Sequence, residues 1–336
     1  MTGPSATDGE IAAINLESVR HRAWARFEHD ARLPGVAEAV VASERLAAQF
    51  LGDLPALDRL ETLALRFARV DNTFRAALIE AEVASAVHRF EDARGHLARA
   101  ALRGAPRDAL EQHSLAVDQA CGRDLEAVLA ARRRIAAASN RLEDRVPLGA
   151  VLADLERFAE ADAVYREAFY SYGGASPFPL AWVCFQLGML WGELVPTPHT
   201  SLAALWYRRA ASYLPGYVKA RVHLAEILLR QHQIDDAESQ LLSVYASRDP
   251  EVRWRLAEVL MAQDRFEEAE AELDAARFGF NALLERHPLA FADHAAEFFA
   301  GSGDDPRRAL VLAGENVANR PTRRALEQAR AIAACA

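Results

Sequence analysis

The sequence predicts an all-α solenoid, a stack of antiparallel helix pairs in which each pair contacts mainly its neighbours. One segment occurs three times, as RFEDARGHLARA at 89–100, RFAEADAVYREA at 157–168 and RFEEAEAELDAAR at 265–277. Each copy has an aromatic residue, a small residue three positions later and a second small residue seven positions after that. These are helical spacings, so each copy is expected to be one helix. Internal repeats of this kind are typical of stacked helical arrays rather than of compact enzyme domains.

The small residues of the repeat indicate where helices touch. They are Ala93, Ala161 and Ala269 near the start of the copies, and Ala100, Ala168 and Ala276 near the end. A small side chain on the apolar face of a helix lets a neighbouring helix approach closely. We therefore expect Ala161 and Ala269 to lie at contacts between helices.

The segment before Asn72 predicts a tail followed by an irregular N-terminal portion. Residues 1–9 are polar and are expected to form a mobile tail. Residues 10–71 are expected to hold degenerate helical repeats that also act as an N-terminal cap. Two helices are expected at 10–31 and 34–50. Gly52 and Pro55 break the second one, and a third helix is expected to run from this break to about Val70.

Residues 72–321 predict better-formed helix pairs separated by Gly and Pro. The expected helices are 72–88 with 89–102, 106–120 with 124–138, two within 142–172, 180–193 with 202–214, two around Leu224 and Leu241, two within 250–286, and two between Pro288 and Pro321. Pro196 and Pro198 lengthen one turn, which predicts a protruding loop at 194–200. Residues 322–336 are expected to form a C-terminal capping helix with no second half.

Composition limits the cellular setting and the partners. No stretch reaches the roughly 20 apolar residues of a membrane span, so no membrane insertion is expected. The N-terminus has neither a basic start nor an apolar signal core, and the three cysteines are widely separated, which favours a cytoplasmic protein. A net charge of −9 disfavours a nucleic-acid partner. We interpret the arginine clusters at 132–134 and 323–324 as solvated helix faces.

Motifs for catalysis are absent from the sequence. Lys219 is the only lysine, so no GxxxxGK[ST] phosphate loop is present, and no GxSxG elbow occurs. His294 and Glu297 lie three positions apart on one helix face and are weak candidates for a metal site. A second helix with further ligands is missing from the pattern, so we expect no metal, no cofactor and no catalytic residues.

The chain resembles the tetratricopeptide repeat (TPR) family from Asn72 to Pro321. That family has a repeat of about 34 residues, with Leu and Gly or Ala in its first helix, then an aromatic residue, Ala, an aromatic residue or Leu, Ala and a closing Pro. Two segments follow this order, with Leu148, Gly149, Phe158, Ala161, Tyr165 and Ala168 in one and Leu187, Gly188, Ala203, Tyr207, Ala210 and Pro215 in the other. The separation between Phe90 and Phe158 equals two such periods.

The resemblance implies a right-handed superhelix whose first helices line a concave groove that holds a peptide or a partner protein. The groove positions carry over to Trp182, Phe185, Met189, Lys219, Val222, Glu226, Arg230, Trp254, Glu258 and Met261. The Lys and Asn set with which cochaperones of the family hold a C-terminal carboxylate is missing, so no cochaperone is predicted. We expect Trp254, Trp182 and Phe185 to form an exposed aromatic ledge, edged by Glu226 and Glu258.

Three functions fit these features. The first is a non-catalytic interaction scaffold that holds a peptide or a partner protein in the groove. The second is a regulator whose superhelix changes pitch when a peptide or small molecule binds. The third is an enzyme, or an accessory subunit of one, built on the repeats. The sequence does not indicate an oligomeric state.

Overall fold

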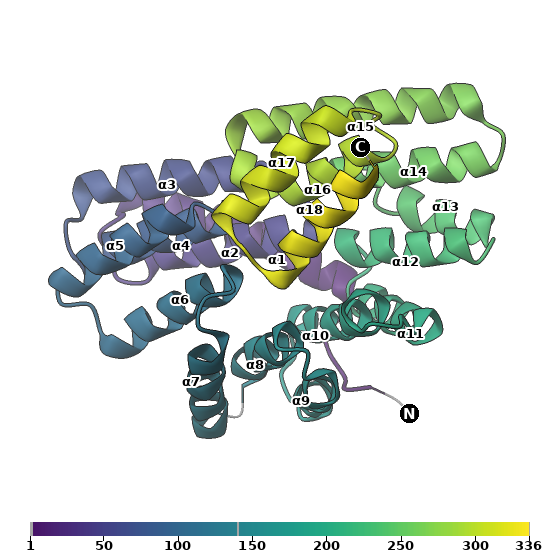
Figure 1. The fold of residues 1–336 in the computed structure, drawn as a ribbon. Helices are drawn as coiled ribbons and strands as arrows, with labels where there is room; N and C mark the ends of the chain where they lie inside the picture. Colours follow the sequence, from purple (N-terminus) through teal and green to yellow (C-terminus); the bar gives the residue numbers. More distant parts are fainter. Residues whose placement is uncertain (1–2, 140, 336) are drawn as a thin grey trace.

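A computed structural model describes residues 3–139 and 141–335. Within these ranges the chain forms eighteen α-helices and one π-helix, and no strand (Figure 1). The segment before Asn72 contains α1 (Gly9–His29), α2 (Val36–Leu51) and α3 (Ala56–Val70). The helices that follow are α4 (Phe74–Ala86), α5 (Phe90–Leu102), α6 (Arg107–Ala120), α7 (Leu125–Ala138), α8 (Leu142–Asp154), α9 (Phe158–Tyr170), α10 (Pro177–Met189), the π-helix η1 (Leu190–Leu194), α11 (Thr200–Tyr213), α12 (Val218–Arg230), α13 (Ile234–Leu242), α14 (Pro250–Ala262), α15 (Phe266–Arg286), α16 (Pro288–Ala300), α17 (Pro306–Asn319) and α18 (Arg323–Cys335). The predicted all-α solenoid is confirmed.

The turn between the two helices of a pair has the same backbone conformation in successive repeats. The residues that adopt positive φ there are His88, Glu156, His232, Asp264 and Asp304, with φ between 47° and 59°. In the first, the N–H of Arg89 donates to the carbonyl of Ala84 at 2.8 Å; in the fourth, the N–H of Arg265 donates to Leu260 at 3.0 Å. A left-handed residue followed by such a bond is the Schellman ending of a helix. This turn reverses the chain, and after His88, Glu156 and Asp264 an Arg–Phe pair begins the next helix.

Close contact between paired helices depends on glycine. A Cβ at Gly149 would lie 2.4 Å from the ring of Tyr165, and a Cβ at Gly188 would lie 2.4 Å from the ring of Tyr207. Any larger residue would push the aromatic side chain of the second helix away. Ala161 and Ala269 are both fully buried, as expected for residues at helix contacts.

The superhelix curves until its two ends meet. His88 Nδ1 lies 3.2 Å from the carbonyl oxygen of Leu289, and Asn319 Nδ2 donates to the carbonyl of His88 at 2.9 Å. His287 Nε2 lies 2.9 Å from a carboxylate oxygen of Asp58 on α3. In Figure 1 the C-terminal helices correspondingly lie beside the N-terminal ones. Besides the contacts between neighbouring repeats, the chain therefore has contacts between its N-terminal and C-terminal helices.

The segment around the predicted protruding loop differs from the prediction in one respect. The helix expected at 180–193 ends at Met189 and continues as the π-helix, in which Val195 N–H donates to Leu190 at 3.1 Å. The loop after it is exposed at residues 196–199, as predicted.

The described part of the N-terminal tail makes contacts with later helices. Thr7 N–H donates to Ala175 at 2.8 Å, and the Tyr213 hydroxyl donates to the carbonyl of Pro4 at 2.9 Å. Residues 3–8 thus run along the outside of α9 to α11, because small residues such as Gly3 fit against Phe169 and Tyr213 there. Among the described helices, none is long and apolar enough to cross a membrane.

Candidate functional site on the inner face

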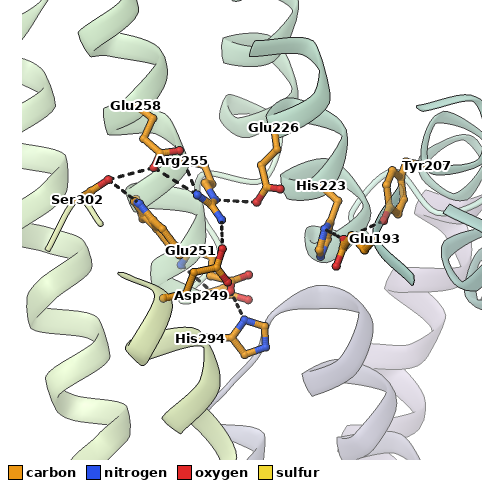
Figure 2. A network of polar contacts seen from close by, with 12 residues as sticks. Glu193, Tyr207, His223, Glu226, Asp249, Glu251, Arg255, Glu258, His294 and Ser302 are labelled. Atoms are coloured by element: carbon orange, nitrogen blue, oxygen red, sulfur yellow. Dashed lines mark hydrogen bonds and ion pairs between the residues drawn. The ribbon is translucent and has the colours of Figure 1, made fainter. Parts of the chain in front are cut away.

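The inner face of the superhelix carries a group of charged side chains from neighbouring repeats (Figure 2). We call this set the inner-face network; it consists of Glu193, His223, Glu226, Glu251, Arg255, Glu258 and His294. Glu193 comes from the π-helix, and the others project from α12, α14 and α16. These are the first helices of successive repeats, so each supplies side chains to the same surface.

Glu193 and His223 form an ion pair at one end of the network. His223 Nδ1 lies 2.8 Å from Glu193 Oε1, and the Tyr207 hydroxyl donates to the same oxygen at 3.3 Å. Burial alone would raise the pKa of Glu193, but the charge of His223 and its hydrogen bond lower it to about 2. Burial opposes protonation of His223, yet the charge of Glu193 raises the pKa of this histidine. Each partner thus favours the charged form of the other.

Arg255 lies at the centre of the network among carboxylates. Its Nε lies 2.7 Å from Glu226 Oε1, and its two terminal nitrogens lie 3.2 Å from Glu258 and 3.4 Å from Glu297. One guanidinium thus faces three acidic side chains, which leaves a local excess of negative charge. Burial raises the pKa of Glu226. The negative charges of Glu193 and Glu251 raise it further, whereas the positive charges of His223 and Arg255 act in the opposite direction.

His294 connects the network to α16. Its Nδ1 pairs with Glu251, the second residue of α14. Burial would lower the pKa of His294, but the charges of Glu251 and Asp293 raise it to about 9. Asp249 caps α14 by accepting the N–H of Glu251 at 3.0 Å. Burial and the charge of Glu251 raise the pKa of Asp249 to about 6.

The C-terminal helix α18 lies across this acidic surface, where Figure 1 shows it between α16 and α10. Arg324 pairs with Glu193 at 2.8 Å, Arg323 pairs with Glu156 at 3.3 Å, and Arg320, just before the helix, pairs with Asp293. The arginines at 323–324 are therefore not simply a solvated face, because they bind carboxylates of distant repeats. Arg132 was also predicted to lie on a solvated helix face, but it is buried and donates to Gln112 at 3.0 Å.

The predicted aromatic ledge is wrong. Trp254 is only 2% exposed, because its ring packs edge-on against Phe280 and Phe298 and its Nε1 donates to Ser302 at 2.9 Å. Phe185 is 7% exposed and packs against Tyr207 and Tyr217. Helices of the following repeat cover both rings, which the sequence pattern of a single repeat does not reveal.

The other predicted groove residues have separate locations. Trp182 and Met189 are half-buried against the main core, and Val222 is buried within it. Glu226 and Glu258 belong to the inner-face network, and Lys219 lines a central cavity. Arg230 and Met261 are exposed. The residues that sequence reasoning missed are Glu193, His223, Glu251, Arg255 and Arg324. The contacts of Glu193 depend on the π-helix, and those of Arg324 depend on the path of α18.

The weak metal candidates make other contacts. His294 pairs with Glu251, and Glu297 lies 3.4 Å from Arg255. No group of three or more His, Cys, Asp or Glu suited to hold a metal ion occurs in the described ranges.

Comparisons with known proteins return only distant likenesses. No protein-family model matches the chain, and no curated protein matches it. Among solved structures, the APC/C hetero-tetramer Cut9-Hcn1 is 15% identical with a TM-score of 0.42 over 90% of this chain and 63% of that chain. This chain thus spans less than two thirds of that one. The C-terminal part of a TPR repeat-containing protein from Cytophaga hutchinsonii is 12% identical with a TM-score of 0.36, over 87% and 97% of the two chains. The human IFIT1 dimer with PPP-AAAA is 13% identical with a TM-score of 0.40, over 93% and 72%.

The fold class is decided by the repeat geometry. The glycine–tyrosine contacts and the Schellman turns recur at the positions that the TPR pattern assigns. The chain is a TPR-like solenoid.

Proposed function

We propose that this TPR-like protein is a non-catalytic scaffold whose acidic inner face binds a basic helical segment of a partner protein. We further propose that α18 occupies this face when no partner is bound. The observation that carries the proposal is the position of α18, a helix with basic residues at its start that lies against the carboxylates of other repeats. The chain thus holds, in cis, a segment of the kind that a partner would supply.

Charge supports this choice of partner. Glu193, Asp293 and Glu156 already accept arginines from the α18 region, and Glu226, Glu258 and Glu297 share only one guanidinium. A basic segment would therefore be attracted, whereas the phosphates of a nucleic acid would be repelled.

The attachment of α18 is weak enough for exchange. Within the helix only Ala325 and Ile332 are buried, and the Arg324 side chain is 59% exposed. Ion pairs as exposed as this one typically contribute about 0–1 kcal/mol each and weaken with salt. A partner helix with a larger apolar face would displace α18.

A scaffold accounts for the inner face better than an enzyme does. Burial strongly raises the pKa of the Cys184 thiol, which favours a packing role over a nucleophilic one. The histidines of the network are held in ion pairs that α18 covers in part. The three cysteines are all free, which supports the proposed cytoplasmic location.

The test uses the full-length chain and a labelled peptide with the sequence of residues 320–336. Replacing Arg323 and Arg324 together by Glu would place like charges beside Glu156 and Glu193 and detach α18. The peptide should then bind the double variant at low salt at least about tenfold more tightly than it binds the parent chain. Arg330→Glu is the matched control, because Arg330 is an exposed residue of the same helix that makes no ion pair among the described residues.

Two results would contradict the proposal. One is equal peptide binding by the parent chain and the double variant. The other is an affinity purification from extracts of the native host in which the double variant recovers the same proteins as the parent chain and no others.

A further inference from the structure

A cavity lies where the first and last repeats of the superhelix meet. Its volume is about 390 Å³, within the range of small-molecule pockets. Helices α2 to α4 form one wall, and α12, α14 and α16 form the other. The cavity therefore exists only because the chain closes on itself and brings distant segments of the sequence together.

One half of the cavity is apolar. Leu54, Leu57 and Phe291 line it, together with the alanines Ala48, Ala86 and Ala290. Phe291 also packs against the core of α1 to α4, which fixes this wall. The surface suits an alkyl or aromatic group.

The other half carries one cation that has no ion-pair partner. Lys219 is the only lysine of the chain, and it makes no hydrogen bond or ion pair with any described residue. The other charged groups of the lining are engaged, since His294 pairs with Glu251, Arg45 pairs with Glu82, and Asp249 caps α14. Lys219 is half-buried.

We propose that this cavity binds a small organic monocarboxylate, with its carboxylate on Lys219 and its apolar body against Leu57 and Phe291. The charge of Lys219 lowers the pKa of Asp249, but its ammonium makes no ion pair with a described residue and can balance one carboxylate. Asp249 and Glu251 lie in the same cavity and would repel the second charge of a phosphate. The cavity shares Glu251 and His294 with the inner-face network, but its ligand would not need to displace α18.

The position of the cavity would couple ligand binding to closure of the superhelix. A ligand that contacts both walls binds the closed superhelix and stabilises it relative to an opened form. Binding should therefore raise the melting temperature of the full-length chain.

The test uses octanoate as the probe and octanamide as its neutral counterpart. Calorimetric titration should show binding of octanoate and at least about tenfold weaker binding of octanamide, because a charge-assisted contact is lost. Lys219→Met keeps the length of the side chain and should weaken octanoate binding by a similar factor. Arg230→Met, at an exposed position of the same helix, should leave it unchanged.

A second measurement does not depend on any variant. Reductive methylation with ¹³C-formaldehyde labels only Lys219 and the N-terminal amine, so the Lys219 methyl signal can be followed by NMR. Octanoate should shift this signal and octanamide should not. The proposal is overturned if octanoate leaves the signal in place, if Lys219→Met binds octanoate as the parent does, or if octyl phosphate binds more tightly than octanoate. The variant with Glu at 323 and 324 should retain octanoate binding, which separates this proposal from the scaffold function.

Discussion

At the scale of single residues, Trp254 shows how tertiary packing decides the role of a side chain. Its position on the first helix of a repeat could be predicted, but its burial depends on Phe298 of α16 and on Ser302 in the turn after that helix. A helical pattern states which residues share a face, and it does not state which later helix will cover that face.

Trp254→Ala should lower the free energy of unfolding by about 3–5 kcal/mol, because it removes a large buried ring from the core of α14 to α18. Chemical denaturation measures this directly. Met261→Ala is the control, since Met261 is 40% exposed on the same helix and should change stability little. A Trp254→Ala chain as stable as the parent would show that the ring is not part of the core.

His294 makes stability depend on pH on the alkaline side. Its pKa in the folded chain is about 9, raised above the ordinary value of 6.5 by Glu251 and Asp293 although burial and Lys219 oppose protonation. The folded state thus holds this proton more tightly, so the stabilisation is complete below about pH 6.5 and is lost as the pH rises through 9.

His294→Gln should therefore reduce stability at pH 6 and flatten its decline between pH 6.5 and 9. His223 also has a raised pKa, so part of the decline should remain. Unfolding free energies measured across this range test the idea, with His21→Gln as the control for loss of an exposed histidine. If the unfolding free energy of His294→Gln falls with pH as steeply as that of the parent, the His294–Glu251 pair does not form.

At the scale of elements, most of the fold could be predicted. Helix starts at Phe90, Phe158 and Phe266 were correct because the repeat places an aromatic residue at the beginning of each second helix. The π-helix was missed, since nothing in the apolar run before Glu193 distinguishes it from an α-helix. The left-handed turn residues were missed too, because His88 and Asp264 share no residue type.

Ala269→Phe tests the register of the repeat. Ala269 has no exposed surface between α14 and α15, so a ring there should cost about 1–3 kcal/mol through overpacking. Thermal and chemical melts should show this loss, whereas Glu270→Phe, at the next and exposed position, should melt near the parent. Equal melting of the two variants would require a different register.

At the scale of the whole molecule, closure of the superhelix is the feature that sequence reasoning could not supply. Contacts such as Asp58 with His287 join residues whose repeats look independent in the sequence. The exposed surface of 15855 Å² still exceeds the ~13,600 Å² that scaling gives for a compact chain of 36.9 kDa. The curvature leaves an inner face, and the candidate site consists of the side chains that successive repeats place on it.

The central claim is that α18 is a detachable helix held on the acidic inner face by ion pairs. Hydrogen exchange of residues 323–335, followed by mass spectrometry at low and high salt, tests it most directly. The account predicts that α18 exchanges faster than α17 and that added salt speeds exchange in α18 alone, because salt screens the pairs of Arg323 and Arg324. Protection of α18 equal to that of α17, and unchanged by salt, would contradict it.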